Sequence, residues 1–521
     1  MINIGEGTPP VEICGILGSV KTRLATALER NRPLGFMIRQ IDPNAKLADE
    51  VSVEAIEAAV PRATVEAVVA DLGVAEQRRR KLPAELTILL TVAMNLFTHD
   101  ALEEVLRKLL QGLRFLWPQP DILTASKGAI SMARYRLGAA PLVELFHRLC
   151  QPMATQQTRG AFLFGLRLMA FDGTNEDLPD TPENARIFGR PGGNRGDGAF
   201  PQAKGFYLTE CGTHAVVDAG FWPCRTGEDS CAHRLLRSVT EGMLLMWDSG
   251  LHSFDLAQDT RATGAHFLGR VPGNVKLQPI WRVSDGSYLA YIYPSDYQRR
   301  KKGEHLLVRV VEYTLTDPAL PGHGQTHRLM TSLLDPGQCP ALELACAYHE
   351  RWEIELSVDE MDTHQKLARH PLRSKKPVGV IQELYALLIA HYVVRHTMHE
   401  AALQASLDPD RLSFTKALSL LCDAIPEFQM VVPEQHEALY RRLLEDIARQ
   451  RLPERQGRTN PRVVKRKMSD FRLKRAEHQH WPQPSVPFRE AVAVSHHATV
   501  PLLAMKLHPS IAYREAAPDL N

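Results

Sequence analysis

The chain has 521 residues, which is more than a single hydrophobic core usually serves, so two or more domains are expected. Hydrophobic residues make up 44% and charged residues 23%, and no apolar run approaches the roughly 20 residues that span a bilayer. These values exclude a membrane-spanning protein and predict a soluble one, while the net charge of +2 says nothing by itself about a partner.

The N-terminus and the cysteines exclude further classes. The first residues lack a basic segment followed by an apolar one, so no signal peptide is predicted and a cytoplasmic location is expected. The eight cysteines are scattered without any CxxC pair, which argues against a zinc knuckle and against a disulfide framework.

Basic residues are unevenly placed. The stretch from Arg449 to Arg475 has eleven Lys or Arg against two acids, and shorter clusters lie at 78–81, 299–302 and 373–376. Nucleic acid is the natural partner for such patches. The alternative is that each run is a solvated face or a tail.

Residues 1–150 are predicted to form a helical N-terminal domain that binds DNA. Apolar residues recur at spacings of three and four in 82–97 and 101–117, as in amphipathic helices. Residues 124–138 resemble a turn and a short helix of a helix-turn-helix reader, with Arg134 and Arg136 on the polar side as DNA contacts. Simple three-helix packing with an exposed arginine pair is the alternative.

After residue 150 the sequence pattern changes to short apolar runs separated by residues typical of turns. An antiparallel meander, a helix and a parallel strand are predicted, which together form an α/β core with a mixed sheet. The predicted strands are 166–173, 203–212, 214–224 and 243–250, with the helix at 230–242. The catalytic domain is assigned to 160–264 and 342–400, a β-rich insertion domain to 265–341, and a helical, basic C-terminal region to 401–521.

Two aspartates are predicted to close strands of this core. Asp172 stands in MAFDGT and Asp248 in LLMWDSG, each followed within two residues by a glycine that lets the backbone turn. Carboxylates bind hard cations, and two such ions can assist both oxygens of a phosphodiester transfer. The alternative is that either aspartate is an ordinary turn residue.

A predicted helix over 348–366 supplies a third acid. At about 100° per residue, one face collects several charged or aromatic side chains around Glu355. They are Tyr348, Arg351, Asp359, Asp362 and Lys366. A salt-bridged face of i,i+4 pairs is the alternative, but it leaves the tyrosine unexplained.

Together these segments resemble a known family. Tyr348-x2-Arg351-x3-Glu355 resembles the Y-R-E signature of the insertion-element-4 family of bacterial DDE transposases, and Glu355 falls on its catalytic glutamate. The segments around Asp172 and Asp248 resemble the two catalytic aspartate motifs of the family. The likeness covers roughly residues 15–400.

The resemblance implies an α/β, RNase H-like catalytic core interrupted by a β-strand insertion domain, which suits the 107-residue interval between Asp248 and Glu355. It implies that Asp172, Asp248 and Glu355 bind Mg²⁺, for which Mn²⁺ can substitute. It also implies double-stranded DNA as partner, both terminal inverted repeats and target, a homodimer in the paired-end complex, and a nucleoid-associated bacterial protein. Cleavage would free a 3′ hydroxyl that attacks target DNA.

Residues around the three acids receive DNA-binding roles. Tyr348 and Arg351 are expected to contact a phosphate. Trp281 in the predicted insertion domain is assigned to stack on an unpaired base, although a tryptophan in a strand is more often a core residue.

The chain departs from the family pattern at two positions. Asp362 stands where the family has lysine seven residues after its glutamate, and Ser249 stands where relatives often have arginine. Lys366, on the same predicted face, is expected to take over the phosphate contact. Two alternatives follow: a catalytically decayed DNA-binding protein, and a hydrolase of small substrates that uses Asp172 and Glu355 as acid and base.

Overall fold

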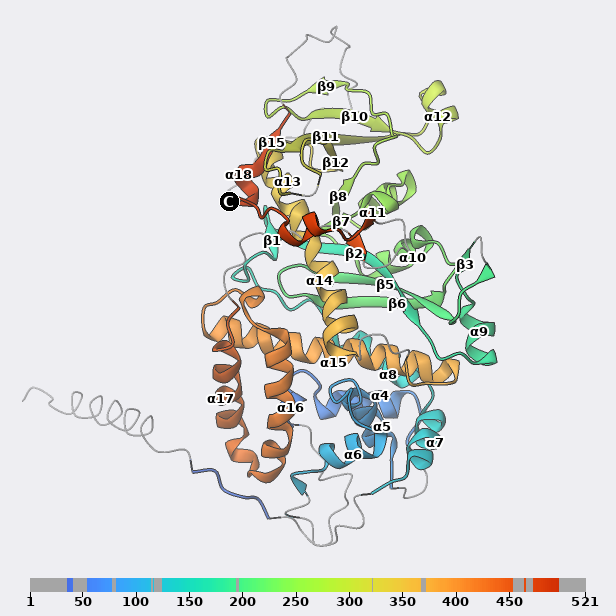
Figure 1. The fold of residues 1–521 in the computed structure, drawn as a ribbon, viewed down its shortest axis with the longest axis vertical. Coiled ribbons are helices and arrows are strands. Elements are labelled where there is room, and N and C mark those ends of the chain that lie inside the picture. Colours follow the sequence, from blue (N-terminus) through green and yellow to red (C-terminus); the bar gives the residue numbers. More distant parts are fainter. Residues whose placement is uncertain are drawn as a thin grey trace, which may run out of the picture.

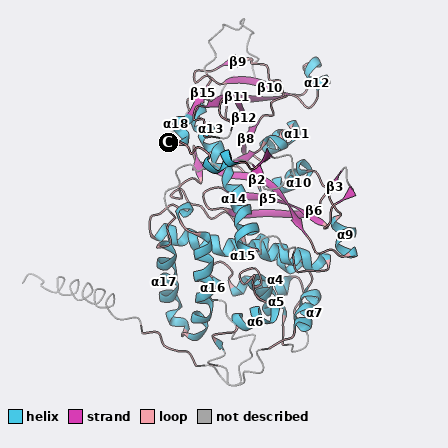
Figure 2. Ribbon diagram, viewed as in Figure 1, coloured by secondary structure: helices cyan, strands magenta, loops and turns pink. Residues whose placement is uncertain are grey.

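The structure is a computed structural model in which one large mixed sheet extends from a helical end to the opposite, β-rich end (Figure 1). It describes residues 35–40, 54–76, 81–113, 116, 124–193, 196–320, 322–366, 372–452, 463–464 and 472–495. Figure 2 shows an all-helical group at one end of the molecule, and the long strands with further helices beside them in its middle and at the other end.

The helical end combines N-terminal and C-terminal segments. The N-terminal helices are α3 (Glu54–Glu57), α4 (Arg62–Asp71), α5 (Ala84–Ala93), α6 (Leu102–Leu109), α7 (Lys127–Leu137) and α8 (Ala140–Leu149). Helix α15 (Pro377–Gln404) packs against α5 and α8 on one side and against α16 (Phe414–Met430) and α17 (His436–Ala448) on another. The predicted helical N-terminal region is therefore present, and α15 joins it to the C-terminal helices in one core.

Helix α15 is long and apolar enough, by composition alone, to cross a membrane. However, 83% of its most apolar window is buried inside the protein, where it contacts helices and strand β6. The apolar surface of α15 is thus buried in the core of the protein. The cysteines that the structure describes are free thiols.

Five strands form the centre of the sheet in the order β6-β5-β2-β7-β8. They are β2 (Leu166–Asp177), β5 (Gln202–Glu210), β6 (Ala215–Pro223), β7 (Met243–Trp247) and β8 (His266–Arg270). Strands β2, β5 and β6 are antiparallel, whereas β7 runs parallel to β2 and to β8. The predicted meander, helix and parallel strand are all present, with α10 (Glu228–Leu235) as the helix, and the arrangement fits the expected core.

The sheet does not stop at β8. Strands β12 (His327–Thr331), β11 (Leu306–Leu315), β10 (Tyr288–Ile292) and β9 (Trp281–Arg282) continue it, and the short C-terminal strand β15 (Val492–Val494) also pairs with β11. The predicted insertion domain began at Ala265, but β8 is paired in parallel with β7 and so belongs to the core sheet. Alternation identifies a strand and not its partner, so the sequence could not show this continuity.

Shorter elements complete the described chain. They are β1 (Phe162–Leu163), α9 (Pro182–Phe188), β3 (Gly192–Gly193), β4 (Gly196–Asp197), η3 (Leu236–Ser238), η4 (Ser249–Leu251), α11 (Phe254–Ala262), α12 (Asp296–Lys301), η6 (Pro409–Arg411), η7 (Pro433–Gln435), β13 (Val463–Val464), β14 (Arg472–Leu473), η8 (Ala476–His480) and α18 (Phe488–Ala491). Most of the basic stretch from Arg449 to Arg475, and residues 78–80, lie outside the described residues.

The predicted continuous helix over 348–366 is wrong in its details. Helix α13 (Ala341–Glu350) ends before Arg351, α14 (Trp352–Asp359) follows, and residues 360–365 form a π-helical turn, η5. Lys366 is already extended, with φ −79° and ψ 158°. Because a π-helix bonds residue i to i+5 and has more residues per turn, the angles assumed for Asp362 and Lys366 do not hold.

Candidate active site

The register of the parallel strands places Asp172 beside Asp248. The last residue pair of β2 and β7 is Ala170 with Met246, and both aspartates lie two residues further along their segments. Neighbouring strands are about 4.8 Å apart, so the same register brings the two backbones together at this end of β7. The site is therefore built by the pairing of two strands whose paired residues are 76 positions apart in sequence, as for Ala170 and Met246 (246 − 170 = 76).

Asp172 does not close its strand, contrary to the prediction. Strand β2 continues to Asp177, and Gly173 stays paired with Phe206 of β5. The strand that ends here is β7, which leaves one side of β2 open beyond Ala170. Asp172 is half-buried and its Oδ1 accepts a hydrogen bond from the Gly173 amide at 2.8 Å.

Asp248 follows the last residue of β7 and caps the short helix η4. Its Oδ1 accepts a hydrogen bond from the Gly250 amide at 2.8 Å, and its side chain is exposed. A β-carbon on Gly250 would lie 3.1 Å from that same oxygen, so a larger residue would crowd the carboxylate. The lack of a side chain at Gly250 therefore leaves room for the Asp248 carboxylate.

Helices α13 and α14 bring Glu355 to these two aspartates. Arg351 donates from Nη2 to Glu355 Oε1 at 3.0 Å, and its guanidinium lies 5.7 Å from the centre of the Tyr348 ring. The Tyr348 hydroxyl donates to the backbone oxygen of Trp247 at 3.3 Å. The tyrosine therefore fastens this helix to the end of β7, next to Asp248, which explains an aromatic residue among charges.

The electrostatics show that the three acids share one environment. The pKa of Asp172 is raised to about 6, chiefly because burial disfavours its charged form; the charges of Glu355 and Asp248 add to the rise, and the Gly173 amide and Arg351 oppose it. Carboxylates whose charges raise the pKa of Asp172 suit a cation, which would compensate them. The donor set, all oxygen, fits a hard divalent ion such as Mg²⁺.

The three carboxylates do not close into a tight cage. In the part of the chain that the structure describes, the group of three donors whose ligand atoms all lie within 4.8 Å of one another is a different one: His214, Glu353 and Asp410. Sequence reasoning missed this group. Its members come from three distant segments, and none of them has a motif spacing.

Lys366 occupies a different place from the predicted phosphate contact. Its side chain is 13% exposed, its ammonium donates to Glu176, and Asp362 Oδ1 lies 2.6 Å away. Burial lowers the pKa of Lys366, but the two carboxylates raise it by more, so its pKa is raised overall. The residue is therefore a buried cation whose charge is compensated by Glu176 and Asp362. The structure gives it a part in the fold in place of the expected DNA-facing position.

Of the two arginines of helix α7, Arg134 differs from the prediction. The helix itself is present, with Ser126 as its N-cap. Arg134 is 6% exposed and its guanidinium donates to Ser374 Oγ at 3.0 Å and to the Gly379 backbone oxygen at 3.2 Å, so the expectation of an exposed DNA contact is wrong for it. Arg136 is partly exposed and donates to Glu76 and to the backbone of Leu82.

Trp281 lies at the rim of the β-rich end. It starts the edge strand β9, pairs with Leu289, and is 53% exposed. It is therefore a surface residue, and a role in base stacking stays a prediction.

Comparisons with known proteins show the family of this chain. Residues 50–147 match the family model of the insertion element 4 transposase N-terminal region, and residues 164–393 match that of the transposase DDE domain. The chain is 30% identical over 403 residues to the transposase InsG for insertion sequence element IS4 of Escherichia coli K12, which covers 76% of this chain and 88% of that protein. The chain belongs to the insertion element 4 family of DDE transposases. It is thus an insertion-sequence transposase.

Two further similarities are weaker. The putative transposase InsZ of Escherichia coli K12 is 27% identical over 180 residues, which are 34% of this chain and 58% of that protein. A solved synaptic complex of the piggyBac transposase with hairpin DNA has a TM-score of 0.38 and 13% identity, covering 78% of this chain and 86% of that one. A similarity at that level does not define a fold.

Proposed function

We propose that this transposase binds the terminal inverted repeats of its insertion sequence, cuts the DNA by two-metal-ion phosphodiester hydrolysis, and joins the 3′ ends to target DNA. The observation that supports this most directly is that Asp172 and Asp248 both stand two residues beyond the last pair of the parallel strands β2 and β7, with Glu355 close enough to raise the pKa of Asp172. The proposed core is RNase H-like, and the proposed working form on DNA is a homodimer that pairs two ends.

Each residue of the site has a proposed part. Asp172 and Asp248 hold one cation jointly, and Asp172 and Glu355 hold the second. Bound Mg²⁺ or Mn²⁺ would stabilise charge on the attacking and leaving oxygens. Arg351 is oriented by Glu355 and by the Tyr348 ring. Its buried Nε has no hydrogen-bond partner among the described residues, so the guanidinium is the proposed donor to a phosphate.

The test uses isosteric substitutions that remove metal ligands without changing shape. Asp172→Asn, Asp248→Asn and Glu355→Gln should each lower cleavage of DNA carrying the inverted repeats that flank the gene by more than about 100-fold, because a direct ligand is lost. Binding of the same DNA in a mobility-shift assay should change little. The matched control is Glu437→Gln on α17, whose side chain is 87% exposed.

Each result has a clear reading. A variant that cuts at the parental rate would remove that residue from the site. A parent protein that shifts the DNA specifically but never cuts it, with Mg²⁺ or with Mn²⁺, would favour the alternative of a decayed, DNA-binding transposase.

A further inference from the structure

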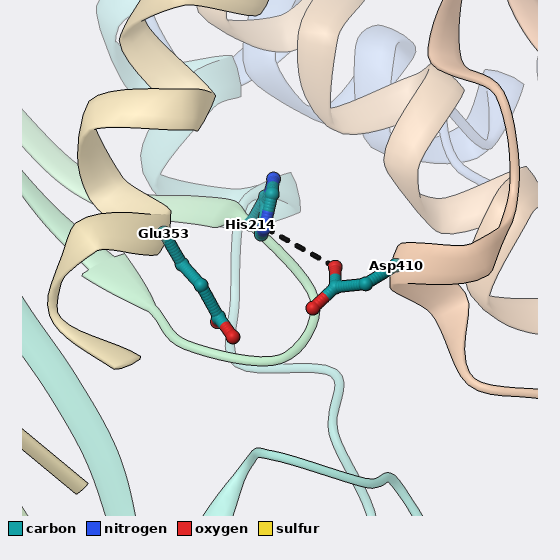
Figure 3. Close-up of side chains that lie close together, drawn as sticks. All are labelled: His214, Glu353 and Asp410. Atoms are coloured by element: carbon teal, nitrogen blue, oxygen red, sulfur yellow. Dashed lines mark ion pairs between the residues drawn. The ribbon is translucent and has the colours of Figure 1, made fainter. Parts of the chain in front are cut away.

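A second group of potential ligands lies on the other side of the helix that bears Glu355. His214, Glu353 and Asp410 place their ligand atoms within 4.8 Å of one another (Figure 3). Residues two apart on an α-helix point about 200° away from each other, so Glu353 turns away from the side that Glu355 faces. The three residues belong to the β5–β6 turn, the first turn of α14, and η6 after α15.

The donor atoms are buried and incompletely satisfied. His214 is 3% and Glu353 7% exposed. His214 Nε2 and Asp410 Oδ1 lie 3.2 Å apart, yet neither atom makes a hydrogen bond of acceptable geometry within the described part of the chain. Two donors that bind one cation at about 2.0–2.2 Å are themselves about 3 Å apart. The separation therefore suits two lone pairs that converge on a shared cation.

The opposite ring nitrogen of His214 faces both a carboxylate and a guanidinium. Its Nδ1 lies 3.5 Å from Glu360 Oε1, and a carboxylate behind the imidazole is the usual second partner that orients such a ligand. Arg395 also contacts this nitrogen, and its Nε donates to Glu360 Oε2 at 2.9 Å, so its charge is balanced by that carboxylate. The Nε2 side remains directed at Asp410.

The backbone holds the donors in place. His214 has φ +58°, a left-handed conformation that is uncommon for a residue other than glycine and is often found at functional sites. Glu353 Oε2 accepts a hydrogen bond from the Gly212 amide in the same turn. Asp410 follows Asp408, whose Oδ1 accepts from the Asp410 amide at 3.0 Å. Each donor is thus positioned by its own segment.

We propose that His214, Glu353 and Asp410 bind one divalent transition-metal ion of the Zn²⁺ class, separate from the cations of the active site. Two carboxylates and an imidazole that gives up its proton to bind carry two negative charges, which one such ion balances. Imidazole favours Zn²⁺ over Mg²⁺, whose ligands are almost all oxygen. The bound ion would tie the β5–β6 turn and η6 to α14, the helix that carries Arg351 and Glu355.

The experiment measures metal on the full-length chain and needs no cleavage activity. The protein is stripped with a chelator, exposed to Zn²⁺ or Co²⁺ in excess Mg²⁺, passed through gel filtration, and analysed for bound metal and for Co²⁺ absorption bands. The parent should retain about one equivalent and gain thermal stability. Asp410→Asn and His214→Asn should each weaken binding at least tenfold, whereas Asp172→Asn should retain the ion.

The choice of variants keeps the result interpretable. Asparagine tolerates the left-handed backbone at position 214, and Asp410→Asn keeps the side-chain shape, so either variant should match the melting temperature of the metal-free parent. A parent that retains no more Zn²⁺ than Asp410→Asn would overturn the proposal, and His214 would then be a protonated imidazole between two carboxylates. Because Asp172→Asn removes the active site but not this group, failure of one proposal is distinguishable from failure of the other.

Discussion

The buried position of Lys366 leads to a prediction that separates a structural cation from a DNA contact. Its ammonium is held by Glu176 and lies 2.6 Å from Asp362, with 13% of the side chain exposed. Lys366→Met keeps the length of the side chain and removes the charge. The two carboxylates would then face each other without a cation, in a site where burial already raises the pKa of Glu176.

The size of the effect follows from burial. Removing one partner of a buried ion pair costs about 3–5 kcal/mol, because an uncompensated charge remains. The free energy of unfolding of Lys366→Met should therefore fall by roughly that amount at neutral pH. Since a protonated Glu176 no longer needs a cation, the deficit should shrink as the pH is lowered and grow as it is raised.

The assay is urea unfolding of Lys366→Met, Glu176→Gln and the double variant, together with the salt dependence of DNA binding. The double variant should lose less than the sum of the two single losses, because the residues share one interaction. The exposed Lys416 on α16 provides the control Lys416→Met. If Lys366→Met instead kept parental stability and reduced the salt slope by about 0.9, the lysine would be a phosphate contact and the reasoning would be refuted.

Two more outcomes are expected. Arg134→Met should lower the free energy of unfolding by about 1.5–3 kcal/mol, through loss of its buried hydrogen bonds to Ser374 and Gly379, and should leave the salt slope of DNA binding unchanged; an unaltered stability would contradict the buried role. Because the pKa of Asp172 is about 6, cleavage should need about tenfold more Mg²⁺ for each pH unit below that value; a Mg²⁺ requirement that stays flat from pH 7 to pH 5 would show that this carboxylate is not a ligand.

The local patterns of the sequence predict the elements well. Continuous apolar residues identify β7, and an aspartate with a glycine two residues later marks the turn at Asp248, because strand burial and turn chemistry are local properties. At Asp172 a similar pattern wrongly predicts the end of a strand. The pairing of strands is not local. That β8 joins the core sheet, and that β2 runs past Asp172, depends on which strand lies next to which, and the sequence pattern does not contain this information.

The burial of charged side chains is the second feature that could not be predicted from the sequence. Arg134 and Lys366 both stand on faces that helical angles assign to solvent, yet each meets a partner from a segment far away, Ser374 for the arginine and Glu176 for the lysine. The π-helical turn after Asp359 compounds the error for Lys366, since it changes the angle per residue. Polar side chains with distant partners are thus the positions where angle arguments fail.

The same reasoning explains why α14 has no single apolar stripe. A helix with one apolar face packs on one side only, whereas α14 packs against β2 and also approaches the β5–β6 turn through Glu353. Ile354 and Ser357 are fully buried between these contacts, while Trp352 is 45% exposed. Two acids two residues apart then point to opposite sides, and only Glu355 lies in the field of Asp172. The helix that carries Glu355, the glutamate proposed as catalytic, is accordingly fixed from both sides, so a change at Glu353 can reach the proposed active site without touching DNA.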